Sequence, residues 1–310
     1  MINLTIMKSK QDQFKADNQS ISVYKSKYLP YWLKNKDILV LSLAFIGFLY
    51  QFATLSMMFS NDILTQNDLR LWNGYFPWWV VFFTFTFWSN FFVFITFTLY
   101  LVFFKWSKLR NNNFFLYMVC CYISVVLIVI AVALLPAAVI ERDNVSFSKH
   151  TNPITMGALI MPHGPGPIYF IFFAMVVCSV NREGNKQILQ LKFWKVFAIL
   201  LSLFICYIIM AIALNFIPIG AYYVNAANQK VYFNGYSVYS KFTCINPNLQ
   251  IVTGGKLTGH GEPVYVLFYF LAILILLISH ITYYFSIRDH LNSYYNVIKI
   301  NNIRKLIIVQ

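Results

Sequence analysis

Six apolar runs, each long enough to cross a bilayer, set the main constraint on what this chain can fold into. They cover residues 38–59, 77–104, 114–140, 154–180, 194–218 and 263–287. An α-helix rises about 1.5 Å per residue, so about 20 residues are enough to cross the roughly 30 Å hydrocarbon layer of a membrane. We therefore expect an all-α, polytopic integral membrane protein with six transmembrane helices.

The composition agrees with a protein that faces lipid. Hydrophobic residues make up 59% of the 310 residues and charged residues only 11%, against about 25% charged residues in ordinary soluble domains. A net charge of +14 would suggest a nucleic-acid partner in a soluble protein. Here the basic residues lie between the apolar runs, so we expect no nucleic-acid partner.

The distribution of basic residues predicts the orientation of the helices. Most of the 24 Lys and Arg residues lie before the first run, after the last run, or in the connections near residues 105–113 and 181–195. The other connections contain only Arg70, Arg142, Lys149, Lys230, Lys241 and Lys256. Because short cytoplasmic segments are enriched in Lys and Arg, both chain ends are predicted to be cytoplasmic, in a plasma membrane.

The predicted organisation has three parts. A basic cytoplasmic segment (1–36) precedes the membrane domain (37–287), whose longest connection is the exterior loop 219–262, and a cytoplasmic tail (288–310) follows. The lysine-rich start differs from a cleaved signal peptide. The five Cys residues predict no disulfide framework. Frequent Phe, Ile, Asn, Lys and Tyr suggest an AT-rich genome, such as that of a low-GC bacterium.

The second run contains a stripe of polar residues. Thr86, Ser89 and Asn90 lie at positions i, i+3 and i+4, so a helix would place them on one face. At membrane depth this face has to contact protein or water. Packing against a neighbouring helix is the simpler explanation, because hydroxyl and amide side chains often join membrane helices. A functional site is the alternative.

The fourth run is interrupted around a histidine. Three prolines and two glycines surround His163 between Pro162 and Pro167, and prolines at this density cannot continue an α-helix. Non-helical backbone at membrane depth is tolerated where it is buried or lines a wet cavity, so His163 is expected to face such a cavity. The alternative is a loop before a shorter span that begins near Gly166, with His163 at the membrane surface.

Together the two runs predict a catalytic pair. If both runs are helical throughout, Thr86 and His163 each lie about 14–15 Å from the outer end of their helix, so they can meet. A threonine hydroxyl is a poor nucleophile without a base, and a neutral imidazole can act as that base. We expect Ser89, Asn90 and Pro167 to line the cavity around this pair.

Other chemistry has little support in the sequence. The five His and five Cys residues show no metal-ligand spacing, and the exterior glycines do not form a phosphate-binding motif. We therefore expect neither a metal nor another cofactor. His280, near the inner end of the last run, is more typical of a histidine that packs between helices.

Two motifs resemble a known family. Residues 85–90, FTFWSN, resemble the FTxxSN signature of bacterial six-helix membrane proteins called Pr6Pr, and His163 with Pro167 matches their H-x-x-x-P motif. Residues 236–248, YSVYSKFTCINPN, also resemble a stretch before the last helix of that group. Several mycoplasma membrane proteins are similar, and the group is distantly related to the androgen-induced and androgen-dependent TFPI-regulating proteins.

This resemblance implies an intramembrane hydrolase of fatty-acid esters. Thr86 corresponds to the family's nucleophile and His163 to its general base. Residues 164–166 depart from the family, which usually has apolar residues between its His and Pro. The expected partners are then membrane lipids and a lipid-ester substrate.

Two further functions stay open from the sequence. A small-solute transporter or channel would use the interrupted run and the polar stripe as parts of its pathway, although no carboxylate or arginine lies within the apolar runs to couple ions. A structural subunit of a membrane complex would instead use its basic ends to bind anionic lipid.

Overall fold

The computed structural model describes residues 36–68, 74–75, 77–103, 112–129, 131–132, 157, 160–225, 227–238, 244–246, 251–253, 256–258 and 264–308. The chain divides into two compact units, Met1–Leu43 and Ala44–Gln310. In the first unit the described residues form the start of helix α3 (Lys36–Asp68). The rest of the basic segment predicted at 1–36 lies outside the described residues.

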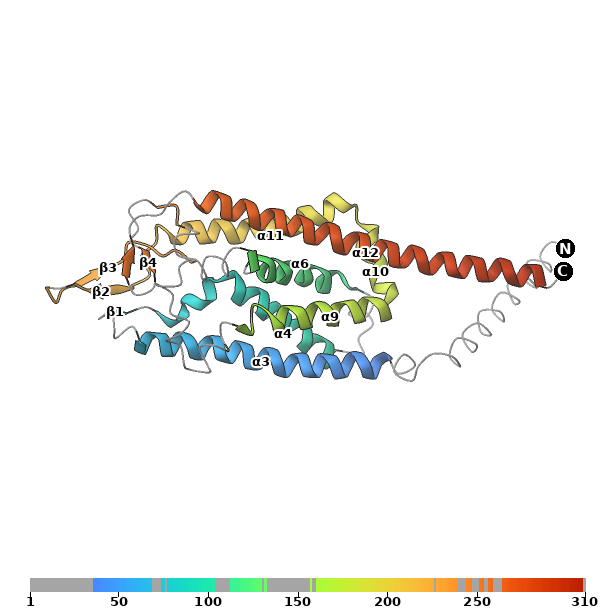
Figure 1. The fold of residues 1–310 in the computed structure, drawn as a ribbon, viewed down its shortest axis with the longest axis horizontal. Coiled ribbons are helices and arrows are strands. Elements are labelled where there is room, and N and C mark those ends of the chain that lie inside the picture. Colours follow the sequence, from blue (N-terminus) through green and yellow to red (C-terminus); the bar gives the residue numbers. More distant parts are fainter. Residues whose placement is uncertain are drawn as a thin grey trace. The chain divides into compact units, whose positions relative to one another are not determined.

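The second unit consists mainly of α-helices (Figure 1). After the remainder of α3 come α4 (Phe85–Val102), α6 (Phe114–Val129), α9 (Pro165–Val180), α10 (Arg182–Gln190), α11 (Phe193–Leu214) and α12 (Val264–Ile308). Among the described residues, four helices are long and apolar enough to cross a membrane, or five if the bent pair α9 and α10 forms one span. These helices are those of a multi-pass membrane protein.

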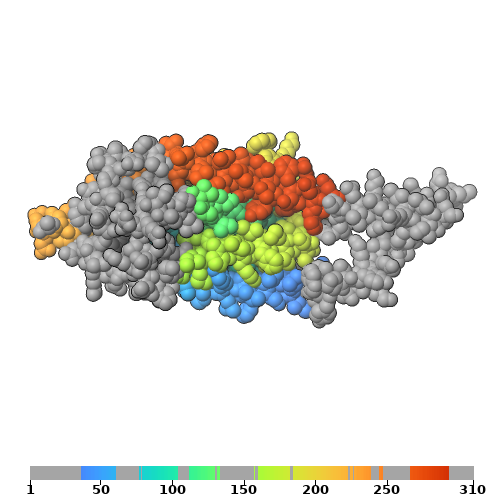
Figure 2. Space-filling model, in the orientation of Figure 1, coloured from blue at the N-terminus to red at the C-terminus, as the bar shows by residue number. Residues whose placement is uncertain are grey.

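Helix α6 is the central helix of this unit. Its buried residues follow one another around the whole helix, and it packs against α4, α9 and α12. Figure 1 shows α6 between α12 and α9, and Figure 2 shows its green atoms where the bands of these two helices meet. A helix that is apolar on all sides is buried, and α4, α9 and α12 cover α6. Residues 133–140 of the third predicted run lie outside the described residues.

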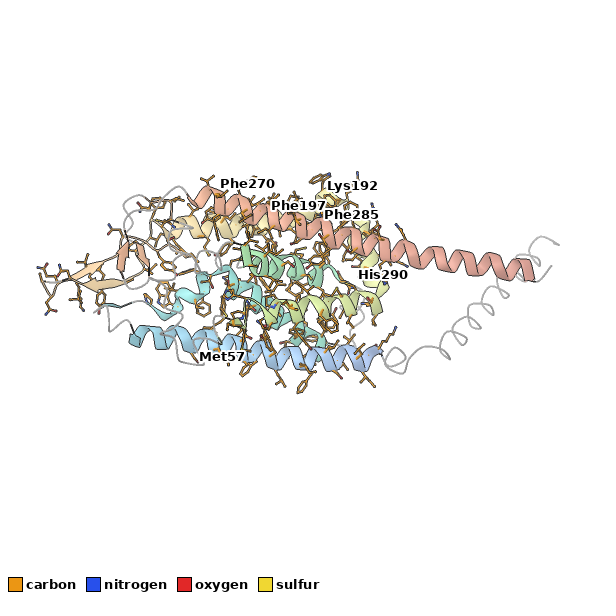
Figure 3. All side chains as sticks on the ribbon, in the orientation of Figure 1. Met57, Lys192, Phe197, Phe270, Phe285 and His290 are labelled. Carbon is orange, nitrogen blue, oxygen red and sulfur yellow. The ribbon has the colours of Figure 1, made fainter. Side chains whose placement is uncertain are left out.

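The outer faces of the other helices carry large apolar side chains. Phe270 on α12 is 64% exposed and Trp194 on α11 is 69% exposed, and Figure 3 shows Phe270 on the outside of its helix. Side chains of this size on the surface of several helices match lipid as the surrounding solvent.

The second predicted run forms two helical segments instead of one. A 3-10 helix, η2 (Trp78–Phe83), ends at Thr84, whose backbone is extended, and α4 begins at Phe85. The Thr84 hydroxyl accepts a hydrogen bond from the Phe87 N–H (3.1 Å), which caps the new helix. A continuous helix over 77–104 is therefore wrong, and Thr86 lies in the first turn of α4.

Prolines mark the start of α9. Residues 161–164 form a turn, and Pro165 and Pro167 lie in the first turn of the helix. Proline is tolerated there because the first helical residues have no N–H partner within the helix. Helix α9 therefore begins at Pro165, and Gly157 and Ile160, before the turn, are also helical, so the fourth run is interrupted at residues 161–164 as its prolines predicted. After α9 the chain bends by 95° into α10.

The described residues of the long connection predicted at 219–262 form two antiparallel strand pairs. Strands β2 (Tyr222–Val224) and β3 (Lys230–Tyr232) pair antiparallel, and β1 (Gly74–Tyr75) pairs with β2. Strands β4 (Ile251–Thr253) and β5 (Lys256–Thr258) form the second pair. Asn215, after α11, accepts a hydrogen bond from the Ile245 N–H (2.8 Å) and so holds the loop to the end of that helix. At the other end of the chain, α12 continues through most of the predicted tail 288–310.

The contact between α3 and α4 depends on a glycine. A Cβ atom at Gly47 would lie 2.4 Å from Cζ of Phe97, whose ring is 1% exposed. We expect Gly47→Ala to lower the free energy of unfolding by about 1–3 kcal/mol, because the buried ring has to move. The double variant Gly47→Ala with Phe97→Leu removes the clashing ring atoms, so its loss should be smaller than the sum of the two single losses. Thermal unfolding of the four proteins in detergent measures this, and strictly additive losses would contradict the contact.

Candidate functional site

The side chains of Thr86 and His163 meet although they are 77 residues apart in the chain. Thr86 Oγ1 lies 3.2 Å from His163 Nε2. Thr86 is 6% exposed and His163 is partly buried. Thr86 belongs to the first turn of α4, and His163 to the turn before α9. The pair therefore lies where two helices begin.

Asn90 joins these two helix starts. Its Nδ2 donates to the Thr86 carbonyl oxygen (2.9 Å) and to the Pro162 carbonyl oxygen (3.1 Å). The first bond spans one turn of α4, and the second reaches the residue directly before His163. Asn90 is fully buried. It thus fixes the backbone on both sides of the Thr86–His163 contact.

Gln51 on α3 completes this cluster, and the sequence analysis missed it. Its Nε2 donates to the side-chain oxygen (2.8 Å) and to the carbonyl oxygen (3.0 Å) of Asn90. Gln51 is fully buried, and its Oε1 has no hydrogen-bond partner within the described part of the chain. The sequence did contain a signal for Gln51, a carboxamide side chain in the middle of an apolar run. Placing a polar group there costs free energy, so such residues usually have a structural or functional role.

The Met161 carbonyl group helps to fix the turn at residues 161–164. The Met161 carbonyl oxygen accepts from the Gly166 N–H (3.0 Å) and from the Tyr50 hydroxyl (3.4 Å). A Cβ atom at Gly166 would lie 2.7 Å from this oxygen, so the close approach requires glycine. Proline and glycine in this segment therefore position His163 instead of leaving the backbone open.

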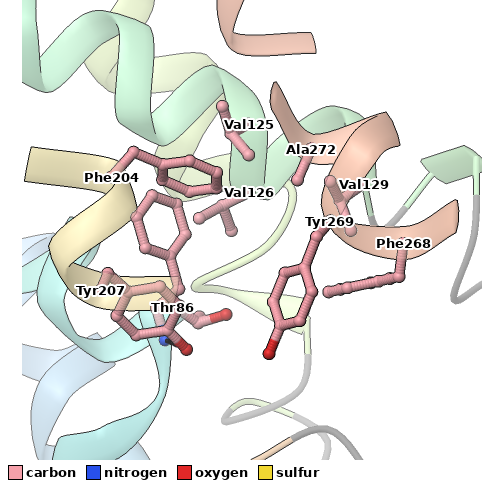
Figure 4. Close-up of a pocket in the computed structure, with 10 residues that line it drawn as sticks. Thr86, Val125, Val126, Val129, Phe204, Tyr207, Phe268, Tyr269 and Ala272 are labelled. Carbon is pink, nitrogen blue, oxygen red and sulfur yellow. Dashed lines mark hydrogen bonds between the residues drawn. The ribbon is translucent and has the colours of Figure 1, made fainter. Parts of the chain in front are cut away.

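Thr86 also lines a small cavity, shown in Figure 4. The cavity volume is about 40 Å³. Its walls come from α4, α6, α11 and α12 and are almost entirely apolar. The lining residues are Phe85, Thr86, Val125, Val126, Val129, Phe204, Tyr207, Phe268, Tyr269 and Ala272. Such a volume holds only one or a few water-sized molecules, since about 10–15 Å³ on this kind of measure is enough for one.

The other predicted cavity residues lie in helix contacts around the pair. Ser89 and Pro167 are buried, and the cavity beside Thr86 is lined by other residues. Ser89 Oγ has no hydrogen-bond partner among the described residues. Tyr207 is a wall residue that sequence reasoning did not identify. Its hydroxyl accepts from the Phe85 N–H (3.0 Å) and donates to the Phe83 carbonyl oxygen (3.1 Å), across the break before α4.

The remaining described histidine inside the membrane domain has a packing environment. His280 is fully buried, with Nδ1 2.6 Å from the Tyr117 hydroxyl and Nε2 3.2 Å from the Phe193 carbonyl oxygen. Within the described ranges, no group of three or more His, Cys, Asp or Glu side chains could hold a metal ion.

No protein-family model matches this chain, and no curated protein or solved structure matches it either. The class of this protein therefore follows from its fold and its site alone. It is a helical, multi-pass membrane protein with a partly buried threonine–histidine contact whose backbone is held by an asparagine.

The cluster around Asn90 gives a direct test of its structural role. Asn90→Ala leaves the Pro162 carbonyl group without its buried donor, so the free energy of unfolding should fall by about 1–3 kcal/mol. Ser89→Ala is the matched control on the neighbouring residue. Because Ser89 Oγ has no described partner, this variant should unfold within about 0.5 kcal/mol of the parent. Equal losses in the two variants, measured by thermal unfolding, would exclude the proposed role of Asn90.

Proposed function

We propose that this protein is an intramembrane hydrolase of lipid esters, with Thr86 as the nucleophile and His163 as the general base. The observation that supports it is the 3.2 Å contact between Thr86 Oγ1 and His163 Nε2. This distance is within the reach needed for proton transfer between a nucleophile and its base. The proposal agrees with the resemblance of FTFWSN and of the His163–Pro167 spacing to the Pr6Pr group, to which we propose this chain is related.

The proposed reaction has two balanced steps. In the first, Thr86 Oγ attacks the ester carbonyl carbon while His163 Nε2 takes the hydroxyl proton; the alcohol then leaves with that proton and an acyl-threonine ester remains. In the second, His163 accepts a proton from water, which attacks the acyl group. The fatty acid leaves, and Thr86 Oγ recovers its proton from His163.

The location of Thr86 favours the charge that develops in these steps. An α-helix carries partial positive charge at its N-terminus, and Thr86 lies in the first turn of α4. A carbonyl oxygen that becomes negative beside Thr86 is stabilised there by about 0.3–1 kcal/mol, and by up to about 2 kcal/mol in a partly buried site. This contribution supports the oxyanion without a dedicated side chain.

The walls beside Thr86 favour an apolar substrate. Valine, phenylalanine and tyrosine side chains line the cavity beside Thr86, so a polar solute would lose its water without compensation. A cavity of about 40 Å³ also requires the aromatic walls to move before an acyl chain can enter. Entry from the surrounding lipid suits a substrate that is already dissolved in the membrane.

The full topology belongs to the same proposal. We propose six transmembrane helices with both chain ends in the cytoplasm, in the plasma membrane of a low-GC bacterium. The supporting features are the six apolar runs and the Lys and Arg residues between them. In this arrangement the β2–β3 hairpin is exterior and α10 lies at the cytoplasmic surface.

Hydrolysis by the purified protein tests the catalytic pair. Fluorescent short- and long-chain fatty-acid esters in mixed micelles are the substrates. Thr86→Ala should reduce turnover to the background rate, whereas Thr86→Ser keeps a hydroxyl and should retain part of it. His163→Ala should lower kcat by about 10²–10⁴-fold, the usual contribution of a general base. A fluorophosphonate should label Thr86 covalently in the parent protein.

Thr96→Val is the matched control for these variants. Thr96 is a buried threonine on the same helix, and its hydroxyl bonds only to the Phe92 carbonyl oxygen in the described contacts. Its loss should leave turnover and labelling unchanged. A folded parent protein with neither turnover nor labelling would reject the hydrolase. Solute flux in proteoliposomes that persists in Thr86→Ala would favour a transporter.

Labelling of introduced cysteines tests the orientation. Lys230→Cys lies in the β2–β3 hairpin and Lys192→Cys before α11, and both parent side chains are exposed. In intact cells a membrane-impermeant maleimide should label Cys at position 230 at once, but position 192 only after permeabilisation. The opposite pattern would show that the topology is the reverse of the proposed one. Labelling of both positions before permeabilisation would show that no membrane span separates them. A cell line with the unsubstituted protein measures background from the five native Cys residues.

A further inference from the structure

A second cavity lies at the other end of α9, away from Thr86. We name it the α9–α12 cavity. Its volume is about 210 Å³. The lining residues are Leu116, Tyr117, Cys120, Ala174, Met175, Cys178, Ser179, Asn185, Tyr283, Ser286, Ile287 and His290. An engineered apolar cavity of about 150 Å³ already binds benzene, so this one has room for a segment of a hydrocarbon chain.

The arrangement of three helices creates this space. Helices α9 and α12 both pack against α6, but they make few contacts with each other. Residues of α6 form the floor, and the facing sides of α9 and α12 form the walls. Met175 belongs to this lining and is also 55% exposed on the surface of α9. The cavity therefore opens sideways toward the lipid.

The polar groups inside the cavity already bond to other protein groups. The Tyr283 hydroxyl lies 2.6 Å from Ser124 Oγ, and the Tyr117 hydroxyl bonds to His280. Asn185 Nδ2 donates to the Cys178 carbonyl oxygen (2.7 Å), and its Oδ1 accepts from Asn113 (2.7 Å). Since these groups require no further partner, the buried part of a ligand gains most by being apolar.

The rim of the cavity is polar and lies beside α10. Ser286 and His290 on α12 are exposed, and Figure 3 shows His290 near α10. Helix α10 is strongly amphipathic and meets α9 at 95°. A short amphipathic helix with this orientation suits the boundary between acyl chains and lipid headgroups. The rim therefore lies at the depth where the polar end of a membrane lipid would be.

From these observations we propose that the α9–α12 cavity binds the acyl chain of a membrane amphiphile, with its polar end at Ser286 and His290. The chain enters between α9 and α12 and rests on α6. This site is separate from the Thr86–His163 pair, and its occupancy does not require hydrolysis. A free fatty acid and a phospholipid share the chemistry that the cavity recognises.

Photocrosslinking tests the proposal and separates these two sources of the chain. The protein is reconstituted in vesicles of phosphatidylcholine and phosphatidylglycerol. One preparation contains a trace of palmitic acid with a diazirine in its chain, and the other a diazirine-bearing ether-linked phosphatidylcholine, which has no ester bond to cleave. After irradiation, peptide mass spectrometry should find adducts concentrated at residues 174–179 and 283–287 in at least one preparation. The preparation with the higher yield identifies the source.

Filling the cavity should remove these adducts. Ala174 is 4% exposed and lines the cavity, so Ala174→Phe places a ring where the chain would lie. We expect the adduct yield to fall by about tenfold, which corresponds to about 1.4 kcal/mol of lost binding free energy. Ala198→Phe is the matched control, because Ala198 is exposed on α11 outside the cavity. Its yield should equal that of the parent.

A milder variant covers the case in which Ala174→Phe does not fold. Cys178→Met adds an adaptable side chain to the same wall and should also lower the yield. Unchanged yield in a folded Ala174→Phe or Cys178→Met protein would overturn the proposal. An even distribution of adducts over the lipid-facing helices would overturn it as well, because that pattern reports only general contact with lipid.

Discussion

Backbone groups inside a bilayer have no water to bind, so each has to find its hydrogen-bond partner within the protein. This requirement shapes the region around Asn90. Two helices begin there, and both begin next to non-helical residues whose carbonyl groups need donors. The Asn90 side-chain amide donates a hydrogen bond to the Pro162 carbonyl oxygen, and the Tyr207 hydroxyl donates one to the Phe83 carbonyl oxygen. Asn90 and Tyr207 satisfy the backbone groups at two breaks in helical structure, one before α4 and one before α9. The Thr86–His163 contact forms where these two breaks meet.

The apolar runs predicted that the chain would form several long apolar helices, because hydropathy follows directly from the solvent around them. They could not locate the helix starts. Thr84 reads as one more residue of an apolar run, yet its hydroxyl caps α4. Pro165 and Pro167 correctly indicated the interruption at residues 161–164, but not that they would form the first turn of α9. A cap and an interruption use the same residue types, and only the tertiary partners of the flanking backbone distinguish them.

The site could be predicted in part for a similar reason. Thr86, His163 and Asn90 stood out because polar residues are rare in apolar runs. Gln51, with Thr54 at i+3 on the same helix face, carried the same signal, but its partnership with Asn90 depended on how α3 and α4 pack. The aromatic walls could not be predicted at all. In a chain with 31 Phe and 21 Tyr, nothing in the sequence separates Tyr207 from the tyrosines that only contact lipid.

Tyr207, a wall residue of the cavity beside Thr86, also holds the start of α4. Tyr207 bonds to backbone groups on both sides of the break before α4, so its displacement would leave an N–H and a carbonyl group unsatisfied. Each such group costs about 1–3 kcal/mol when buried. Phe268 on α12 lines the same cavity, and its ring contacts the Tyr269 ring. Movement of the α11 wall therefore breaks hydrogen bonds at the break before α4, so Tyr207 fixes both the cavity wall and the backbone that leads into Thr86.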